Sequence, residues 1–278
     1  MVPMLTPKLF CNECNLRTEI PKLIASKVTG NESLSLLVAR YEQMRQGYNC
    51  SYEEWRTIFT PVLKPFKRYE DTTAVVIPIF DAKFREDFDI LGLGAIGLDL
   101  PTWFNITSNN TRIMIIAQDP LRNNHWYGDC HDLIISSPFG LHDAVHRAKG
   151  NGGKMANLLI QRLIEYGYGV YLTDANKYFV YDRKTSMLYS KRRLNDYVDI
   201  LQQELNLVKP SICVCLGNKS KQVLEKCLTK VKVIVLPHLS GTARGAIIKK
   251  FPILKEKKST AENIASMYVS EIVKTLEL

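Results

Sequence analysis

From residue 112 onward, short apolar runs alternate with segments whose apolar residues recur at helical spacing. Four runs are typical of buried strands: residues 112–117, 170–174, 211–217 and 231–237. Four segments are typical of helices: residues 153–167, 194–205, 219–228 and 260–276. Apolar strands that are separated by helices favour a mostly parallel sheet covered on both faces. The sequence therefore predicts an α/β fold for this part of the chain.

The first part of the chain has a different character. Residues 1–70 are predicted to form a helical N-terminal extension, with helices over residues 31–44 and 51–59 that each begin at a capping residue. Residues 71–278 form the second predicted domain. Within it, residues 81–111 are rich in Gly, Asp and Asn in places, so we expect them to be irregular.

Composition narrows the class of protein. The 278 residues include 37 Lys and Arg against 28 Asp and Glu. A net charge of +9 is typical of a protein with a polyanionic partner, and composition alone leaves a merely soluble basic protein as an equal alternative. The apolar runs are too short to span a bilayer, and the first residues lack the pattern of a secretory signal. Seven scattered cysteines are typical of a reducing compartment. We expect a soluble, cytoplasmic monomer without a membrane partner.

Polar and aromatic residues follow the predicted strands. Gln118 and Asp119 leave the first strand, Asp174 ends the second, His238 follows the last, and Phe139 lies in a Ser-Pro-Phe-Gly turn. In parallel sheets the ligand crevice lies beyond the carboxyl ends of the strands. An acid and a histidine there can stabilise a cation and an anion that separate during bond cleavage, and an aromatic ring can stack on a flat ligand. The alternative is that Asp119 caps the next segment and His238 is an ordinary loop histidine.

The order of the motifs A-Q-D-P, S-P-F-G, V-Y-L-T-D-A-N-K, V-C-L-G and P-H-L-S-G-T-A-R resembles the uracil-DNA glycosylase superfamily over about residues 110–278. The resemblance implies a three-layer α/β/α sandwich with a central, mainly parallel four-stranded sheet. It also implies that residues 71–278 are a catalytic domain whose partner is DNA. Such enzymes flip a nucleotide out of the stack before they cleave its glycosidic bond.

Roles at the base follow from the same resemblance. Asp119 matches the acid that orients the attacking water and supports the oxocarbenium-like sugar. Gln118 matches the neighbour whose backbone contacts the base, and Phe139 matches the ring that stacks on it. His238 matches the histidine that hydrogen-bonds the base O2 and stabilises the departing anion. Asp119 and His238 are therefore the candidate catalytic residues.

The resemblance also indicates DNA contacts. Ser240 matches a serine that contacts a phosphate, and Gly241–Arg244 matches the wedge that enters the duplex, with Arg244 as the candidate that fills the gap. The stretch 181–193 carries five basic residues and two tyrosines directly after the strand that reads the base. Three of them, Lys191, Arg192 and Arg193, are predicted phosphate contacts. The alternative for this stretch is an ordinary solvated loop.

Two positions depart from the family pattern. Enzymes that excise uracil carry an asparagine where this chain has Asp174, and a tyrosine where it has Leu121. An ionised carboxylate only accepts hydrogen bonds, so it suits the N4 amine of cytosine and not the O4 atom of uracil. Leu121 is smaller than tyrosine and leaves room at C5 of the base. Together they predict a C5-substituted cytosine, such as the hydroxymethylcytosine or glucosylated form found in phage DNA, as the excised base, and a role in phage defence.

Three functions stay open at this point. The first is a monofunctional glycosylase for a modified cytosine, and the second is a uracil-DNA glycosylase of base-excision repair in which Asn176 or a backbone amide reads the base. The third is a non-catalytic DNA-binding module on the same fold. For Asp174, the alternative is that its carboxylate bonds a backbone amide and another residue reads the base.

A metal site is a further question. Cys11 and Cys14 resemble the N-terminal C-x-x-C of an iron–sulfur branch of the superfamily, but Tyr178 stands where the third ligand would follow Lys177. We therefore expect no cofactor. Zinc or a cluster at Cys11 and Cys14, completed by Cys50, Cys130 or His131, is the alternative.

Overall fold

The computed structural model describes residues 15–49, 75–77, 96–120, 133–149, 151–177, 179–180 and 194–277. Among these residues the central sheet has the strand order β3-β6-β4-β8-β9. The strands are β3 (Thr102–Phe104), β4 (Arg112–Ala117), β6 (Gly169–Asp174), β8 (Ile212–Leu216) and β9 (Lys232–Leu236). All neighbours are parallel except β3, which pairs antiparallel with β6 at one edge. The predicted four parallel strands are thus confirmed, and β3 adds an antiparallel fifth.

The strand register brings the exits of these strands to one edge. Ala117 at the end of β4 pairs with Asp174 at the end of β6, and Leu216 of β8 pairs with Leu236 of β9. The segments that follow β4 and β6 therefore begin side by side, and the segment that follows β9 begins at the same edge, beyond β8. This is the edge at which parallel sheets bind ligands.

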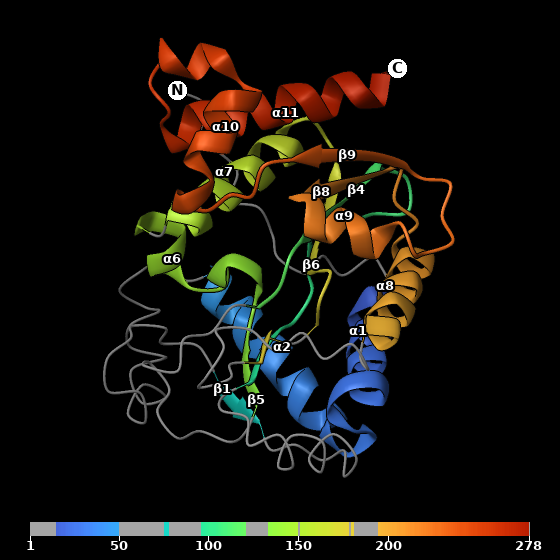
Figure 1. The fold of residues 1–278 in the computed structure, drawn as a ribbon. Helices are drawn as coiled ribbons and strands as arrows, with labels where there is room; N and C mark the ends of the chain where they lie inside the picture. The colour runs from blue at the N-terminus through green and yellow to red at the C-terminus, as the bar shows by residue number, and fades with distance from the viewer. Residues whose placement is uncertain are drawn as a thin grey trace.

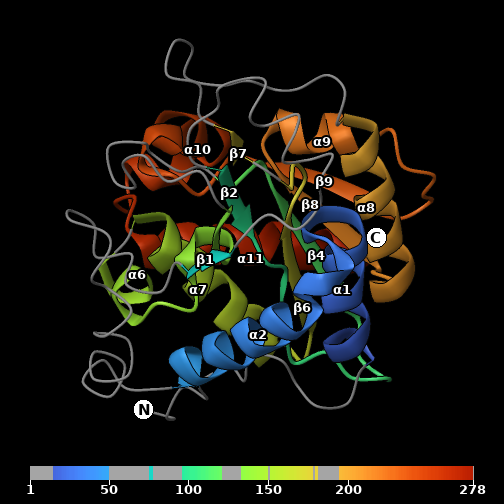
Figure 2. The ribbon, with the colours of Figure 1, turned by 90° about the horizontal axis from the view of Figure 1, so that it is seen from below.

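Helices cover both faces of the sheet, as Figures 1 and 2 show. Helices α7 (Asn151–Glu165) and α11 (Ala261–Glu277) pack together on one face, and α8 (Leu194–Val208) and α9 (Asn218–Leu224) lie on the other. In α7, residues 155, 156, 159, 160 and 163 are buried, which is the spacing of one helix face. The three-layer α/β/α sandwich is confirmed.

The N-terminal helices join the same hydrophobic core. They are α1 (Leu16–Ile24), the π-helical turn η1 (Ala25–Thr29), the short η2 (Asn31–Ser33) and α2 (Leu34–Asn49). The ring of Tyr41 in α2 lies 5.7 Å from that of Trp103 in β3. The predicted helix over residues 31–44 is confirmed, whereas the predicted helix over residues 51–59 lies outside the described residues.

A second, smaller sheet lies beside the first, with strand order β1-β5-β2-β7. Its strands are β1 (Val75–Ile77), β2 (Ile96–Asp99), β5 (Leu133–Ser136) and β7 (Phe179–Val180). The prediction that residues 81–111 are irregular is wrong for β2 and for β3, which carry buried Leu98 and Trp103. Strands of three or four residues are too short to show a periodicity in sequence.

No helix within the described ranges combines the length and the apolar character that crossing a membrane requires.

Candidate active site

The exit of β4 holds an acid in a defined place. Hydrogen bonds between β4 and β6 continue beyond both strands, because Ala175 N–H donates to the Ala117 carbonyl at 2.9 Å and Asn176 N–H to the Gln118 carbonyl at 3.0 Å. The side-chain amide of Gln118 donates to Oδ2 of Asp119 at 2.5 Å, and both side chains are half-buried. The next residue, a buried proline, fixes the backbone after the acid.

His238 comes to the same edge from β9. The hydroxyl of Tyr268 in α11 donates to the Pro237 carbonyl at 2.8 Å and anchors the start of this loop. Burial lowers the pKa of His238 below its ordinary value, and the negative charge of Asp119 acts in the opposite direction. The carboxylate therefore lies close enough to the imidazole to influence its charge. At neutral pH the imidazole is uncharged and has one N–H to donate.

Phe139 reaches the site from the loop after β5. Its ring centroid lies 5.4 Å from that of His238, with 37° between the two planes. Phe139 lies in the short η4 (Pro138–Gly140) and has a φ of 58°, a left-handed conformation that is uncommon for a residue with a side chain. A 2.6 Å hydrogen bond between Ser137 Oγ and His142 Nδ1 links the two ends of the loop that carries Phe139. Strain of this kind persists only where the surroundings hold it.

Two glycines at the start of α7 let both loops approach the helix. A Cβ atom on Gly152 would lie 2.9 Å from the Leu239 carbonyl oxygen and 3.2 Å from Cδ1 of Phe139. A Cβ atom on Gly153 would lie 2.5 Å from the His146 carbonyl oxygen. Gly152 therefore lies where the Phe139 loop and the His238 loop meet.

Asp174 ends β6 and its residue is 2% exposed. The preceding residue, Thr173, bonds Glu204 of α8 through its hydroxyl. Because successive side chains of a strand point to opposite faces, Asp174 points to the face away from α8. That face carries α7, and the η4 turn with Phe139 contacts β6. Thus Asp119, Phe139, Asp174 and His238 converge at one edge of the sheet.

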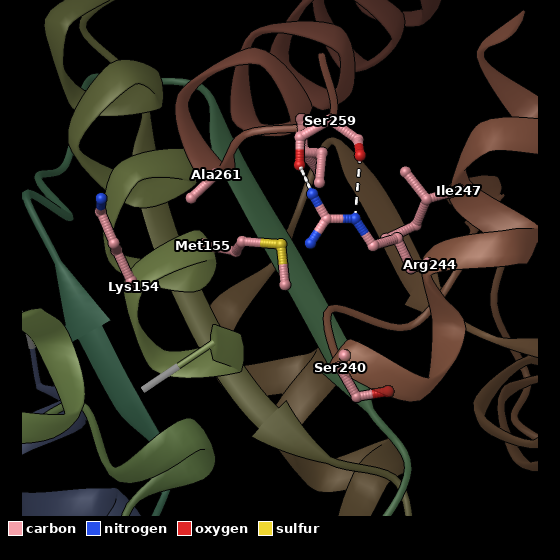
Figure 3. Close-up of a pocket in the computed structure, with 9 residues that line it drawn as sticks. Lys154, Met155, Ser240, Arg244, Ile247, Ser259 and Ala261 are labelled. Atoms are coloured by element: carbon pink, nitrogen blue, oxygen red, sulfur yellow. Dashed lines mark hydrogen bonds between the residues drawn. The ribbon is translucent and has the colours of Figure 1, made fainter. Parts of the chain in front are cut away.

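Ser240 and Arg244 lie beside this crevice. The chain passes from the His238 loop through η6 (Gly241–Ala243) into α10 (Arg244–Lys250). A cavity of about 70 Å³ is lined by Ser240, Arg244 and Lys154, among others, and Figure 3 shows these side chains. Arg244 Nε donates to Ser259 Oγ at 2.8 Å, and its guanidinium also donates to the Ser259 carbonyl. The gap-filling role of Arg244 stays a prediction, and it requires the side chain to leave Ser259.

Several predicted site residues lie outside the described residues: Leu121, Lys191, Arg192, Arg193, Cys11 and Cys14. The same holds for Cys50, Cys130 and His131. Within the described ranges no group of three or more His, Cys, Asp or Glu side chains is placed to hold a metal ion. The metal alternative and the role of the basic stretch therefore stay predictions.

Sequence reasoning missed two features of the site. One is Gly152, which the pattern presents only as part of a helix start. The other is a buried ion pair between Lys177 and Glu204 behind the exit of β6. A signal for Glu204 existed, because it lies three and four residues after Leu201 and Ile200 on the apolar face of α8. Nothing in the pattern indicated that its partner is 27 residues away.

The arrangement suits the cleavage of a bond whose two fragments develop positive and negative charge as they separate. The Asp119 carboxylate can stabilise positive charge and orient a water molecule, and the uncharged imidazole of His238 can donate to developing negative charge. Phe139 offers a ring on which a flat group can stack. These groups come from three separate loops, so the fold and not the local sequence sets their spacing.

Comparison with known proteins agrees with this geometry. A family model described as the uracil DNA glycosylase superfamily matches residues 104–257, a span that includes β4, β6, β8, β9 and all four converging residues. No curated protein matches the chain.

Proposed function

Because this chain belongs to the uracil DNA glycosylase superfamily, we propose that it is a monofunctional DNA glycosylase that flips out and excises a C5-substituted cytosine. Membership implies in general a hydrolase of N-glycosidic bonds whose substrate is DNA. The choice of base goes beyond membership and rests on this chain's own residues. Asp119 orients the water, His238 donates to the departing base, and an abasic site is left in the DNA.

The position of Asp174 is the observation that carries the choice of base. Its side chain leaves β6 on the face that carries Phe139, and its backbone neighbours are bonded to the Ala117 and Gln118 carbonyls. A base stacked on Phe139 would present its Watson–Crick edge to whatever group ends β6. In this chain that group is a carboxylate, where the uracil enzymes have an amide.

The hydrogen-bond inventory then favours cytosine. A carboxylate accepts from the N4 amine of cytosine, whereas the O4 atom of uracil is itself an acceptor and would face it unfavourably. One good base-edge contact is worth about 1–3 kcal/mol of discrimination, or roughly 5- to 160-fold. Leu121 in place of tyrosine supports a C5 substituent, and such bases in phage DNA support a role in phage defence.

Defined oligonucleotides test this proposal. Duplexes that carry a single hydroxymethylcytosine, glucosylated hydroxymethylcytosine, cytosine or uracil are incubated with the protein and then cleaved with alkali at abasic sites. We expect cleavage at a C5-substituted cytosine and little at uracil. The Asp174→Asn variant should shift the preference toward uracil by roughly 5- to 160-fold, because the amide both donates and accepts.

Other outcomes point elsewhere. Cleavage at uracil alone, unchanged in Asp174→Asn, would favour a uracil-DNA glycosylase. In that case the candidate reader is Asn176, which is 4% exposed in the same turn. Binding without cleavage of any duplex would indicate a non-catalytic module.

A further inference from the structure

Next to the end of β6, where Asp174 lies, two charged side chains form a buried ion pair. Lys177 Nζ lies 2.7 Å from Glu204 Oε2, and both side chains are fully buried. Taking two charges out of water is costly, so such a pair is weak evidence for stability. A pair of well-packed apolar side chains would serve stability as well or better. This pair therefore calls for a reason other than holding the fold together.

Its hydrogen bonds supply that reason. An ammonium group has three N–H donors, and Lys177 uses them on Glu204, on the Thr173 hydroxyl and on the Asp174 carbonyl, each at 2.7 Å. The Thr173 hydroxyl in turn donates to the Glu204 carboxylate at 3.1 Å. Two of the three acceptors thus belong to the last two residues of β6. The network fixes that strand end from the face opposite the one to which Asp174 points.

Three aromatic side chains, from α2, β3 and β6, pack against one another near this network. Burial raises the pKa of Tyr41 in α2 and of Tyr171 in β6, and the negative charge of Glu204 raises both further. Tyr171 lies two residues before Thr173, so its side chain leaves β6 on the face that carries Glu204. Trp103 packs against both tyrosines, with its ring centroid 5.7 Å from Tyr41 and 6.5 Å from Tyr171. An apolar cover of this kind lowers the local dielectric constant and strengthens the bonds beneath it.

We propose that Lys177 and Glu204 are positioning residues for Asp174 at the end of β6 and for the turn that follows it. They act through the backbone of Asp174, and neither needs to touch DNA. The expected effect on excision rests on the proposed glycosylase activity. The expected effect on the backbone of the turn, that the ion pair holds it in place, does not depend on that activity.

The double variant Lys177→Met/Glu204→Leu separates positioning from stability. Either single change would leave one buried charge without its partner and destabilise the fold, whereas the double change leaves an apolar contact of similar size. We expect the double variant to fold with a Tm within a few degrees of the wild type. Hydrogen exchange at the Ala175 and Asn176 amides, which bond the β4 exit, should become at least about tenfold faster. Excision should lose kcat by at least about tenfold with a smaller change in KM, because ground-state DNA contacts remain.

A matched control is the exposed pair formed by Lys221 of α9 and Glu225, the residue that follows this helix, at 3.1 Å. The Lys221→Met/Glu225→Leu variant should change neither readout. Should the apolar double variant fail to fold, Lys177→Met/Glu204→Gln also removes both charges and keeps an acceptor for the Thr173 hydroxyl, and it should still speed exchange at these two amides.

Two results would overturn the inference. One is wild-type exchange at Ala175 and Asn176 in a folded double variant. The other is faster exchange with unchanged excision by an enzyme whose wild type is active. If the wild type releases no base from any DNA, the proposed function fails, and the exchange measurement alone decides whether the pair holds the turn.

Discussion

At the scale of single residues, burial and the charge of Asp119 shift the pKa of His238 in opposite directions. Burial disfavours the charged form of His238, and the Asp119 carboxylate favours it. Burial is the larger effect, so the imidazole is uncharged at neutral pH. An uncharged donor can stabilise a departing anion without neutralising the carboxylate that stabilises the sugar cation. In the proposed reaction, the two opposite charges of the transition state would therefore have separate partners.

This balance predicts a signed response to mutation. In Asp119→Asn the carboxylate charge is gone, so the pKa of His238 should fall further below its ordinary value of about 6.5. An NMR titration of the His238 ring protons in both proteins measures it. A rise, or no change, would mean that the two groups do not influence each other as the structure indicates.

The same shift has a consequence for stability. Since the pKa of His238 is lower in the folded than in the unfolded chain, the unfolded chain takes up the proton first as pH falls. The uncharged His238 therefore contributes its full share to the free energy of unfolding above about pH 6.5. This contribution is lost as the pH falls from there toward the pKa of His238 in the folded chain.

At the scale of elements, α7 brings two site loops together at its first turn. Its Gly152 contacts the Phe139 ring from one loop and the Leu239 carbonyl from the other. A helix normally gains about 1 kcal/mol when alanine replaces an interior glycine. At this position the gain is offset, because a carbonyl oxygen 2.9 Å away belongs to the backbone and cannot rotate aside.

We therefore expect Gly152→Ala to lower the free energy of unfolding by about 1–3 kcal/mol and to slow excision, since the Phe139 and His238 loops must move apart. Thermal unfolding and the oligonucleotide assay measure the two effects. Gly245→Ala in α10 is the matched control, because a Cβ there would meet nothing within 4 Å. Its Tm should rise or stay the same. Equal Tm changes in the two variants would contradict the proposed contact.

The elements also show what the sequence could predict. β4, β6, β8 and β9 are short runs of mostly apolar residues, and α7, α8 and α11 carry apolar residues at helical spacing, so the sequence pattern predicts them. β2 and β3 are three or four residues long and become strands only because partners distant in sequence pair with them. The site residues that directly follow strands were predictable for the same topological reason. Lys177–Glu204 and Gly152 were not, because their partners are contacts of the folded chain.

At the scale of the whole molecule, the N-terminal helices belong to the same core as the α/β sandwich. Leu37 and Met44 of α2 are fully buried in a cluster that extends to Ile272 of α11. The net charge of +9 favours a polyanion as partner, and family membership implies that this partner is DNA. The sheet edge and the excess of basic residues thus fit the proposed activity, the removal of a base from DNA.

The most direct test is the identity of the released base. Genomic DNAs that carry different natural cytosine modifications are incubated with the wild type and with Asp119→Ala, and the freed bases are identified by mass. We predict a C5-substituted cytosine from the wild type and none from Asp119→Ala, which should still bind DNA. Release of uracil alone, or equal release by both proteins, would contradict the assignment of the Asp119, His238 and Asp174 crevice to modified cytosine.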